Sequence, residues 1–122
     1  MCIRDSEDRA DALFHALADR TRRDIMRRVL AGEHSVTALA ANYDMSFAAV
    51  QKHVAVLQRA GLLTKRRNGR EQIASGDVDA VRAVSSMLTD LEQVWRARIA
   101  RIDELLASDT ATDNPIDPIP ED

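Results

Sequence analysis

Aromatic residues and cysteine are both scarce in this 122-residue chain. It contains two Phe, one Tyr and one Trp, whereas Ala, Leu, Val and Arg are frequent, and this composition favours helices. Cys2 is the only cysteine. A single thiol excludes an intrachain disulfide, and it cannot build a zinc or arsenic site by itself.

Long apolar runs are also missing. No stretch approaches the roughly 18 apolar residues of a membrane-spanning helix, so we expect no membrane association. The N-terminus lacks the apolar segment of a secretory signal, which favours a cytoplasmic location. Residues 1–6 (MCIRDS) are similar to the translation of a sequencing adapter, and we interpret them as a non-native scar or a disordered arm.

The charge is unevenly distributed along the chain. The net charge is −3, yet residues 20–70 carry eleven Lys or Arg against three acidic residues, a net charge of +8. The segments on either side are acidic, with −3 over residues 1–19, −3 over 71–108 and −5 over 109–122. A basic middle between acidic ends is expected when one face meets phosphate groups, although a plain solvated surface has the same composition.

Hydrophobic spacing predicts four helices before residue 61. The first covers about residues 8–18, the second ends at Gly32, and Ser35 or Thr37 can cap a short third helix. Ser46 caps the fourth helix, which stops at Gly61. The inward stripe of this fourth helix is Val50, Val54 and Leu57. Residues 35–60 therefore form a helix, a turn and a helix.

A basic hairpin is predicted directly after the fourth helix. Residues 62–67 and 70–75 are short strand-like runs separated by Asn68 and Gly69, and both of these residues accept positive φ in a type I′ turn. The hairpin is rich in arginine at its tip. By itself, such a hairpin is also compatible with a feature that only improves solubility.

A long last helix is expected over about residues 78–106. Its apolar residues recur every three or four positions over about eight turns, and one small domain cannot cover so long a stripe, so we expect part of it to meet a second subunit. Residues 108–122 hold three prolines and five acidic residues and are expected to form a disordered tail. The predicted organisation is therefore an arm (1–6), one domain (7–107) and a tail (108–122).

The predicted fold class is mainly α with a small β-hairpin, a winged helix-turn-helix. In such a fold the second helix of the pair enters the major groove of DNA, while the hairpin lies over the backbone or minor groove. The exposed face of that helix holds Gln51, which can bridge adenine N6 and N7, and Lys52, which can donate to guanine or phosphate. Ser46 at the helix N-terminus suits a phosphate. The predicted recognition-helix contacts are Ser46, Phe47, Ala48, Gln51, Lys52 and His53; those of the wing and backbone are Arg22, Arg23, Lys65, Arg66, Arg67, Asn68 and Arg70.

Each of these residues also has a structural interpretation. Gln51 and Lys52 could be ordinary solvent-facing residues, and Phe47 could fill the core rather than touch a thymine methyl group. His53 lies near the edge of the apolar stripe, where a packing role is the alternative to base reading. Their order along one chain, followed by a basic hairpin, favours the DNA-binding interpretation.

The chain resembles the ArsR family of winged helix-turn-helix repressors. The similarity covers residues 12–106, and Gly69 and Arg70 in the wing belong to it. The other residues that carry it are 13–19, 21–23, 25, 35–36, 39–40, 45–46, 49–50, 52–54, 57 and 60–62. The resemblance implies a homodimer formed by the first and last helices, and repression by occupying an operator that overlaps a promoter. The predicted dimer interface contains Leu13, Phe14, Leu88, Leu91, Trp95, Ile99 and Ile102.

The chain departs from the family pattern at several positions. Arg20 stands where proline is usual, Gln51 stands where serine is common, and the second wing strand lacks the usual aromatic residue, which suggests a short or frayed strand. Metal-sensing members carry ligands on the third or last helix, whereas here the stretch 35–44 has neither Cys nor His and the last helix has no His. We therefore expect no metal and no cofactor, as in a metal-independent branch of the family.

The sequence therefore predicts a homodimeric, sequence-specific regulator that binds double-stranded DNA at a pseudo-palindromic operator. It indicates neither a small-molecule effector nor the operator sequence. The main rival is a winged-helix dimer that acts as a protein-interaction module through its acidic surface. An enzyme is the third possibility, but no paired catalytic carboxylates, activated nucleophile or glycine-rich phosphate loop is present in the sequence.

Overall fold

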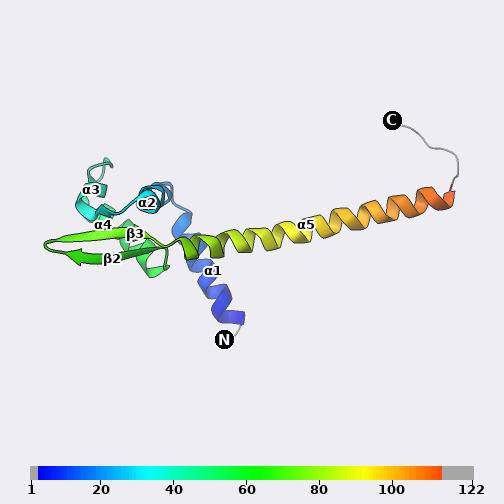
Figure 1. Ribbon diagram of the computed structural model, residues 1–122, viewed down its shortest axis with the longest axis horizontal. Helices are drawn as coiled ribbons and strands as arrows, with labels where there is room; N and C mark the ends of the chain where they lie inside the picture. The colour runs from blue at the N-terminus through cyan, green and yellow to red at the C-terminus, as the bar shows by residue number, and fades with distance from the viewer. Residues whose placement is uncertain (1–2, 114–122) are drawn as a thin grey trace. The chain divides into compact units, whose positions relative to one another are not determined.

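A computed structural model describes residues 3–113 (Figure 1), and it is mainly helical with one small antiparallel sheet, as the sequence predicted. The chain divides between Ser86 and Met87 into two units, which are described separately. None of the described helices combines the length and the apolar composition that crossing a membrane requires. The elements in chain order are α1 (Ile3–Leu17), α2 (Arg20–Ala31), β1 (His34–Ser35), α3 (Val36–Ala40), α4 (Phe47–Arg59), β2 (Leu63–Asn68), β3 (Glu71–Gly76) and α5 (Val78–Asp113).

Polar side chains cap the starts of three helices, two of them at the serines that the sequence singled out. The carboxylate of Asp19 accepts the backbone N–H of Arg22 at 3.0 Å, which starts α2. The Ser35 hydroxyl accepts the N–H of Ala38 at 3.0 Å, which starts α3, and Ser46 caps α4 in the same way. Each cap satisfies a backbone donor that the first turn of a helix leaves unpaired, so the helix-turn-helix begins where local chemistry dictates.

The core of the first unit lies between the helices and the inner face of the sheet. Val50, Val54 and Leu57 of α4 are buried, which confirms the predicted inward stripe. Burying one such side chain contributes about 1.5–3 kcal/mol. Leu13 of α1 is also fully buried within the single chain, so its side chain has no surface to offer a second subunit. The predicted dimer interface is corrected at this residue. The other large, fully buried side chains are Ile25, Leu39, Leu62 and Leu63.

The sheet differs from the predicted hairpin in three ways. Asn68 pairs with Glu71, so the two turn residues are Gly69 and Arg70 rather than Asn68 and Gly69. The φ of Gly69 is +67°, and a glycine at the first central position supplies the positive φ that a two-residue turn requires there. The second wing strand is neither short nor frayed, because β3 has six residues and lies between its two partners. One partner, β1, was not predicted, since a two-residue strand has no periodicity of its own.

Both terminal helices are longer than expected. α1 starts at Ile3 and α5 continues to Asp113, past the predicted end near residue 106. The rest of the predicted tail, 114–122, lies outside the described residues, as do Met1 and Cys2. The division into arm, domain and tail stays a prediction.

Candidate nucleic-acid interface

The exposed face of α4 carries the side chains that the sequence assigned to base reading. Ala48, Gln51 and Lys52 are exposed, on the side of the helix opposite buried Val50 and Val54. Small residues let the helix approach a groove floor closely, and the amide of Gln51 has both a donor and an acceptor. The local periodicity of α4 is therefore sufficient to present these groups together.

A groove of about 200 Å³ separates α4 from the hairpin. Phe47 stands in its wall and is 45% exposed, so it does not fill the core. Gln51 of α4 and Lys65 and Arg70 of the hairpin line the same groove, which brings the predicted recognition helix and wing together at one site. The remaining lining residues are Val36, Thr37, Val54, Glu71 and Gln72.

The basic residues of the wing are divided between the two faces of the hairpin. Lys65 pairs with Ala74, which is fully buried, so Lys65 lies on the inner face, which is packed against the core. Alternation along the strand places Arg67 on this face and Arg66 on the opposite, outer face. Thr64 and Ser75 are also directly paired across the strands, and their hydroxyl oxygens lie 3.1 Å apart, as expected for side chains on one face. Only part of the predicted basic strip therefore faces α4.

Arg22 and Arg23, predicted to bind the DNA backbone, donate hydrogen bonds inside the protein. Arg22 Nε donates to the Ala16 carbonyl at 2.6 Å and its Nη2 to the His15 carbonyl at 3.0 Å, while Arg23 Nη1 donates to the Leu17 carbonyl at 2.8 Å. Cations are favourable at the carbonyl end of a helix, here that of α1. These contacts give both arginines a role in joining α1 to α2.

His53 of α4 lies beside the contacts between α1 and α2. Its Nδ1 lies 3.3 Å from Arg22 Nη1 and 4.0 Å from a carboxylate oxygen of Asp19. The backbone N–H of Arg22 holds the pKa of Asp19 below its usual value, and the charges of His53 and Arg22 act in the same direction. This geometry supports the packing interpretation of His53.

A second polar cluster joins α2 to the turn of the helix-turn-helix, and no motif in the sequence predicts it. Tyr43, in the turn after α3, donates its hydroxyl to Asp24 Oδ2 at 2.6 Å. Arg28 Nε donates to the same oxygen at 3.0 Å, and its guanidinium lies 5.7 Å from the centre of the Tyr43 ring. The hydrogen bonds from Tyr43 and Arg28 lower the pKa of Asp24. Burial, followed by the bond to Asp24, raises the pKa of Tyr43 to about 12.

This cluster predicts a loss of stability at alkaline pH. The phenol of Tyr43 keeps its proton to about pH 12 in the folded protein, whereas the unfolded phenol ionises near pH 10. The contribution of the protonated Tyr43 phenol to the free energy of unfolding is therefore present below pH 10 and is lost as pH rises towards 12. Urea denaturation at about pH 8 and pH 11 measures the change in the free energy of unfolding. At pH 8, Tyr43→Phe should lower this free energy by about 1.5–3 kcal/mol, because the hydrogen bond to Asp24 is lost. Between pH 8 and pH 11 the variant should lose less stability than the wild type, because it has no phenol to ionise. An unchanged alkaline loss in the variant contradicts this assignment.

A separate apolar stripe runs along the part of α5 that belongs to the second unit. Leu91 is 66% exposed and Trp95 is 56% exposed, and Leu88, Ile99 and Ile102 are exposed on the same side of the helix. Leu88 and Ile99 are eleven residues apart, as are Leu91 and Ile102. This spacing is 3.67 residues per turn, close to that of a straight helix, so the stripe keeps to one side along its length.

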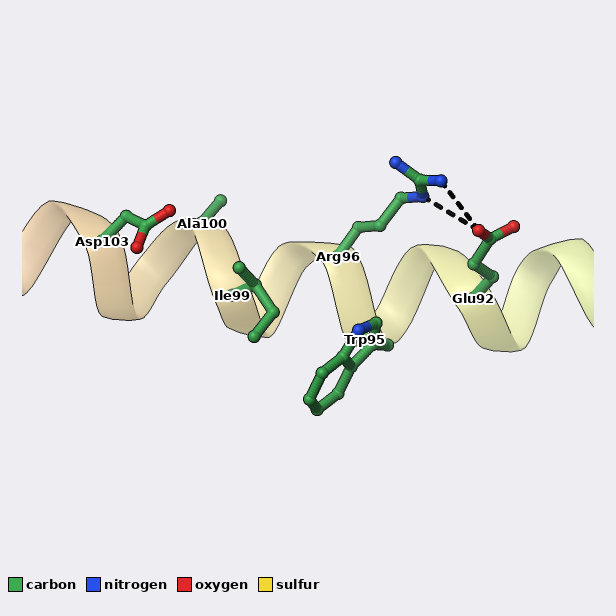
Figure 2. A pocket seen from close by; sticks show the side chains of 6 residues that line it. All are labelled: Glu92, Trp95, Arg96, Ile99, Ala100 and Asp103. Atoms are coloured by element: carbon green, nitrogen blue, oxygen red, sulfur yellow. Dashed lines mark hydrogen bonds and ion pairs between the residues drawn. The ribbon is translucent and has the colours of Figure 1, made fainter.

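Charged residues border the α5 stripe. Figure 2 shows Trp95 on one side of the helix and the Glu92–Arg96 ion pair on the other, with Arg96 Nη2 at 2.8 Å from Glu92 Oε2. The Arg98 guanidinium lies 5.9 Å from the Trp95 ring. Ile99, Ala100 and Asp103 complete the shallow surface groove drawn there. An exposed apolar stripe with a charged border is typical of a helix that packs against a partner.

The fold and the groove between α4 and the wing define a DNA-binding transcriptional regulator, and the comparisons agree. A helix-turn-helix domain family matches residues 17–66. The regulator Rv2034 of Mycobacterium tuberculosis is 34% identical over 99 residues, which are 81% of this chain and 90% of that protein. The uncharacterised regulator YuzN of Bacillus subtilis is 39% identical over 70 residues, 52% of this chain and 76% of that protein.

A solved structure is also similar over most of the chain. The ArsR-like transcriptional regulator from Rhodococcus sp. RHA1 is 26% identical, with a TM-score of 0.72 over 81% of this chain and 93% of that one. The chain belongs to the ArsR family of winged helix-turn-helix transcriptional regulators. The family resemblance seen in the sequence is thereby confirmed.

Proposed function

We propose that this regulator is a repressor that binds a pseudo-palindromic operator as a homodimer in the cytoplasm. The observation that carries the proposal is the shared groove, where Gln51 of α4 meets Lys65 and Arg70 of the wing. These residues belong to the segment 20–70, whose net charge is +8 in a chain that is acidic elsewhere. Such a surface attracts the phosphates of duplex DNA and places a helix against its bases.

The proposed contacts fall into two kinds. Gln51 reads an adenine in the major groove, with Ala48 and Phe47 against the bases beside it, and Lys52 donates to guanine or phosphate. Ser46 lies at the N-terminus of α4, where backbone amides suit a phosphate oxygen. Lys65, Arg67, Asn68 and Arg70 contact the backbone without reading sequence.

The α5 stripe supports the homodimer. A second copy of the stripe would cover Leu91 and Trp95, and Phe14 of α1 offers a further exposed apolar side chain. On a pseudo-palindromic site, the two recognition helices of a homodimer would lie about one turn of DNA apart, roughly 34 Å. Occupation of such a site over a promoter would block transcription.

Substituting Gln51 tests base reading. After duplexes are selected from random DNA, Gln51→Ala should lose about 1–3 kcal/mol on the selected site and relax the preference at one base pair per half-site, because only the amide contact is removed. Affinities for the site and its single-base variants measure this. Gln93→Ala removes an exposed glutamine from α5 and serves as the matched control.

Two results would count against the proposal. Equal losses on selected and random duplexes would exclude Gln51 as a base reader. If the protein does not bind genomic DNA fragments, or if salt does not weaken that binding, the result would favour the alternative role as a protein-interaction module.

A further inference from the structure

Arg66 of β2 forms an ion pair with Glu33, far away in the sequence. Its Nη2 lies 2.7 Å from Glu33 Oε1, with 56% of the arginine side chain and 52% of the glutamate side chain exposed. Glu33 lies between the end of α2 and the start of β1. The pair therefore joins the distal part of the hairpin to the segment between α2 and β1.

The sheet register explains how the two residues meet. Arg66 is paired with Ile73 of β3, and Ile73 is paired with Ser35 of β1. Directly paired residues project from the same face, so the arginine reaches across β3 towards the beginning of β1. This is the outer face of the hairpin, the one without Lys65.

Beyond its backbone pairing with β3, the distal part of the hairpin buries no side chain. Residues 66–72 are all exposed, whereas Leu63 and Ala74 at its base are buried. No apolar burial therefore restrains the angle of the tip relative to α4. The Glu33 carboxylate, one of three acidic residues in the basic segment 20–70, neutralises the wing arginine that projects from the outer face.

We propose that the Glu33–Arg66 pair is a strut that sets the angle of the wing, and that Arg66 is a positioning residue rather than a phosphate contact. The inference rests on the proposed function, because the wing is positioned for DNA. It revises the role that the sequence alone predicted for Arg66. A charge facing away from α4 and already paired adds little to counterion release.

Neighbouring residues of one strand provide a matched test in the full-length protein. Arg66→Ala and Lys65→Ala each remove one positive charge from β2, but from opposite faces. Lys65→Ala should reduce the slope of log affinity against log salt by about 2 for a dimer, one per subunit. Arg66→Ala should leave the slope unchanged and lower affinity about 2- to 5-fold per wing at every salt concentration, the range for an exposed ion pair.

Exchanging the two charges makes the test sharper. The double variant Glu33→Arg, Arg66→Glu keeps the net charge and should recover most of the wild-type affinity, whereas Arg66→Glu alone should be weaker than Arg66→Ala. A phosphate contact at position 66 would behave differently, because the exchanged protein would then bind as poorly as Arg66→Glu. That result, or an equal loss of slope in Arg66→Ala and Lys65→Ala, overturns the strut.

A measurement on the free protein separates the strut from DNA binding. Amide hydrogen exchange over residues 66–72 should be faster in Arg66→Ala and Glu33→Gln and return to the wild-type rate in the exchanged protein. Exchange rates unaffected by all three changes overturn the strut even if DNA binds normally. A wild-type protein that binds no duplex overturns the proposed function. In that case the exchange rates by themselves still test the strut.

Discussion

Raising the salt concentration from about 50 to about 200 mM is expected to weaken operator binding by about 10⁴-fold, within the range of 10³–10⁵ for six to ten phosphate contacts. The proposed phosphate contacts are Lys52, Lys65, Arg67 and Arg70. None of the four has an ion pair with a carboxylate among the side chains of residues 7–107. Arg67 Nε donates to the Gly69 carbonyl at 3.2 Å, but this neutral partner leaves the charge of the guanidinium available to displace a counterion. Eight such cations in a dimer give a log–log slope of roughly −7.

Fluorescence anisotropy with a labelled duplex over a series of salt concentrations measures this slope. The internal hydrogen bonds of Arg22 and the outward position of Arg66 keep these two residues out of the count. A slope near −2 would mean that the strip barely contacts DNA and would count against the proposed interface. Random duplex provides the control, since its binding should show a similar slope at lower affinity.

Placing charges in the α5 stripe should separate the dimer and lower operator affinity by about 10²–10⁴-fold. The double variant Leu91→Asp, Ile102→Asp introduces two carboxylates into the stripe, where a second subunit would otherwise bury them without partners. The large effect arises because a monomer loses the effective concentration that the first bound half-site confers on the second. Sedimentation analysis gives the mass, and anisotropy gives the affinity.

The opposite side of α5 supplies a matched control. Gln93→Asp, Ala97→Asp adds the same charge at two exposed positions away from the stripe and should leave both mass and affinity unchanged. Trp95 is the only tryptophan and reports directly, because its emission should shift to the red when the partner is lost. A stripe variant that stays dimeric, or a wild-type chain that is monomeric at micromolar concentration, would contradict this role of α5.

Much of the scaffold could be read from residues close together in the sequence. Ser35 and Ser46 cap helices through bonds that span three residues, and the spacing of Val50, Val54 and Leu57 alone identifies the inward side of α4. Once that side is known, the exposed position of Gln51 follows from helical geometry. The family resemblance relied on the same short motifs and was confirmed by the comparisons.

Other features depend on contacts between distant segments. Neither residue of β1 carries a strand signal, because its hydrogen bonds come from β3, about forty positions later. The turn moved by one residue because the register that buries Leu63 and Ala74 pairs Asn68 with Glu71. Sequence patterns are sensitive to periodicity and caps, but they do not contain the register that brings two segments together.

The positions of the helices, the serine caps and the basic segment could therefore be read from the order of the residues, since each depends on interactions within a few positions. Which cations face α4 and which bind partners inside the protein depends on contacts between distant segments. Arg22 reaches the carbonyl end of α1 and Arg66 reaches Glu33, while Lys65 and Arg70 remain beside the groove. An arginine has the same charge in all these places, and its partner is set by how the chain brings distant residues into contact.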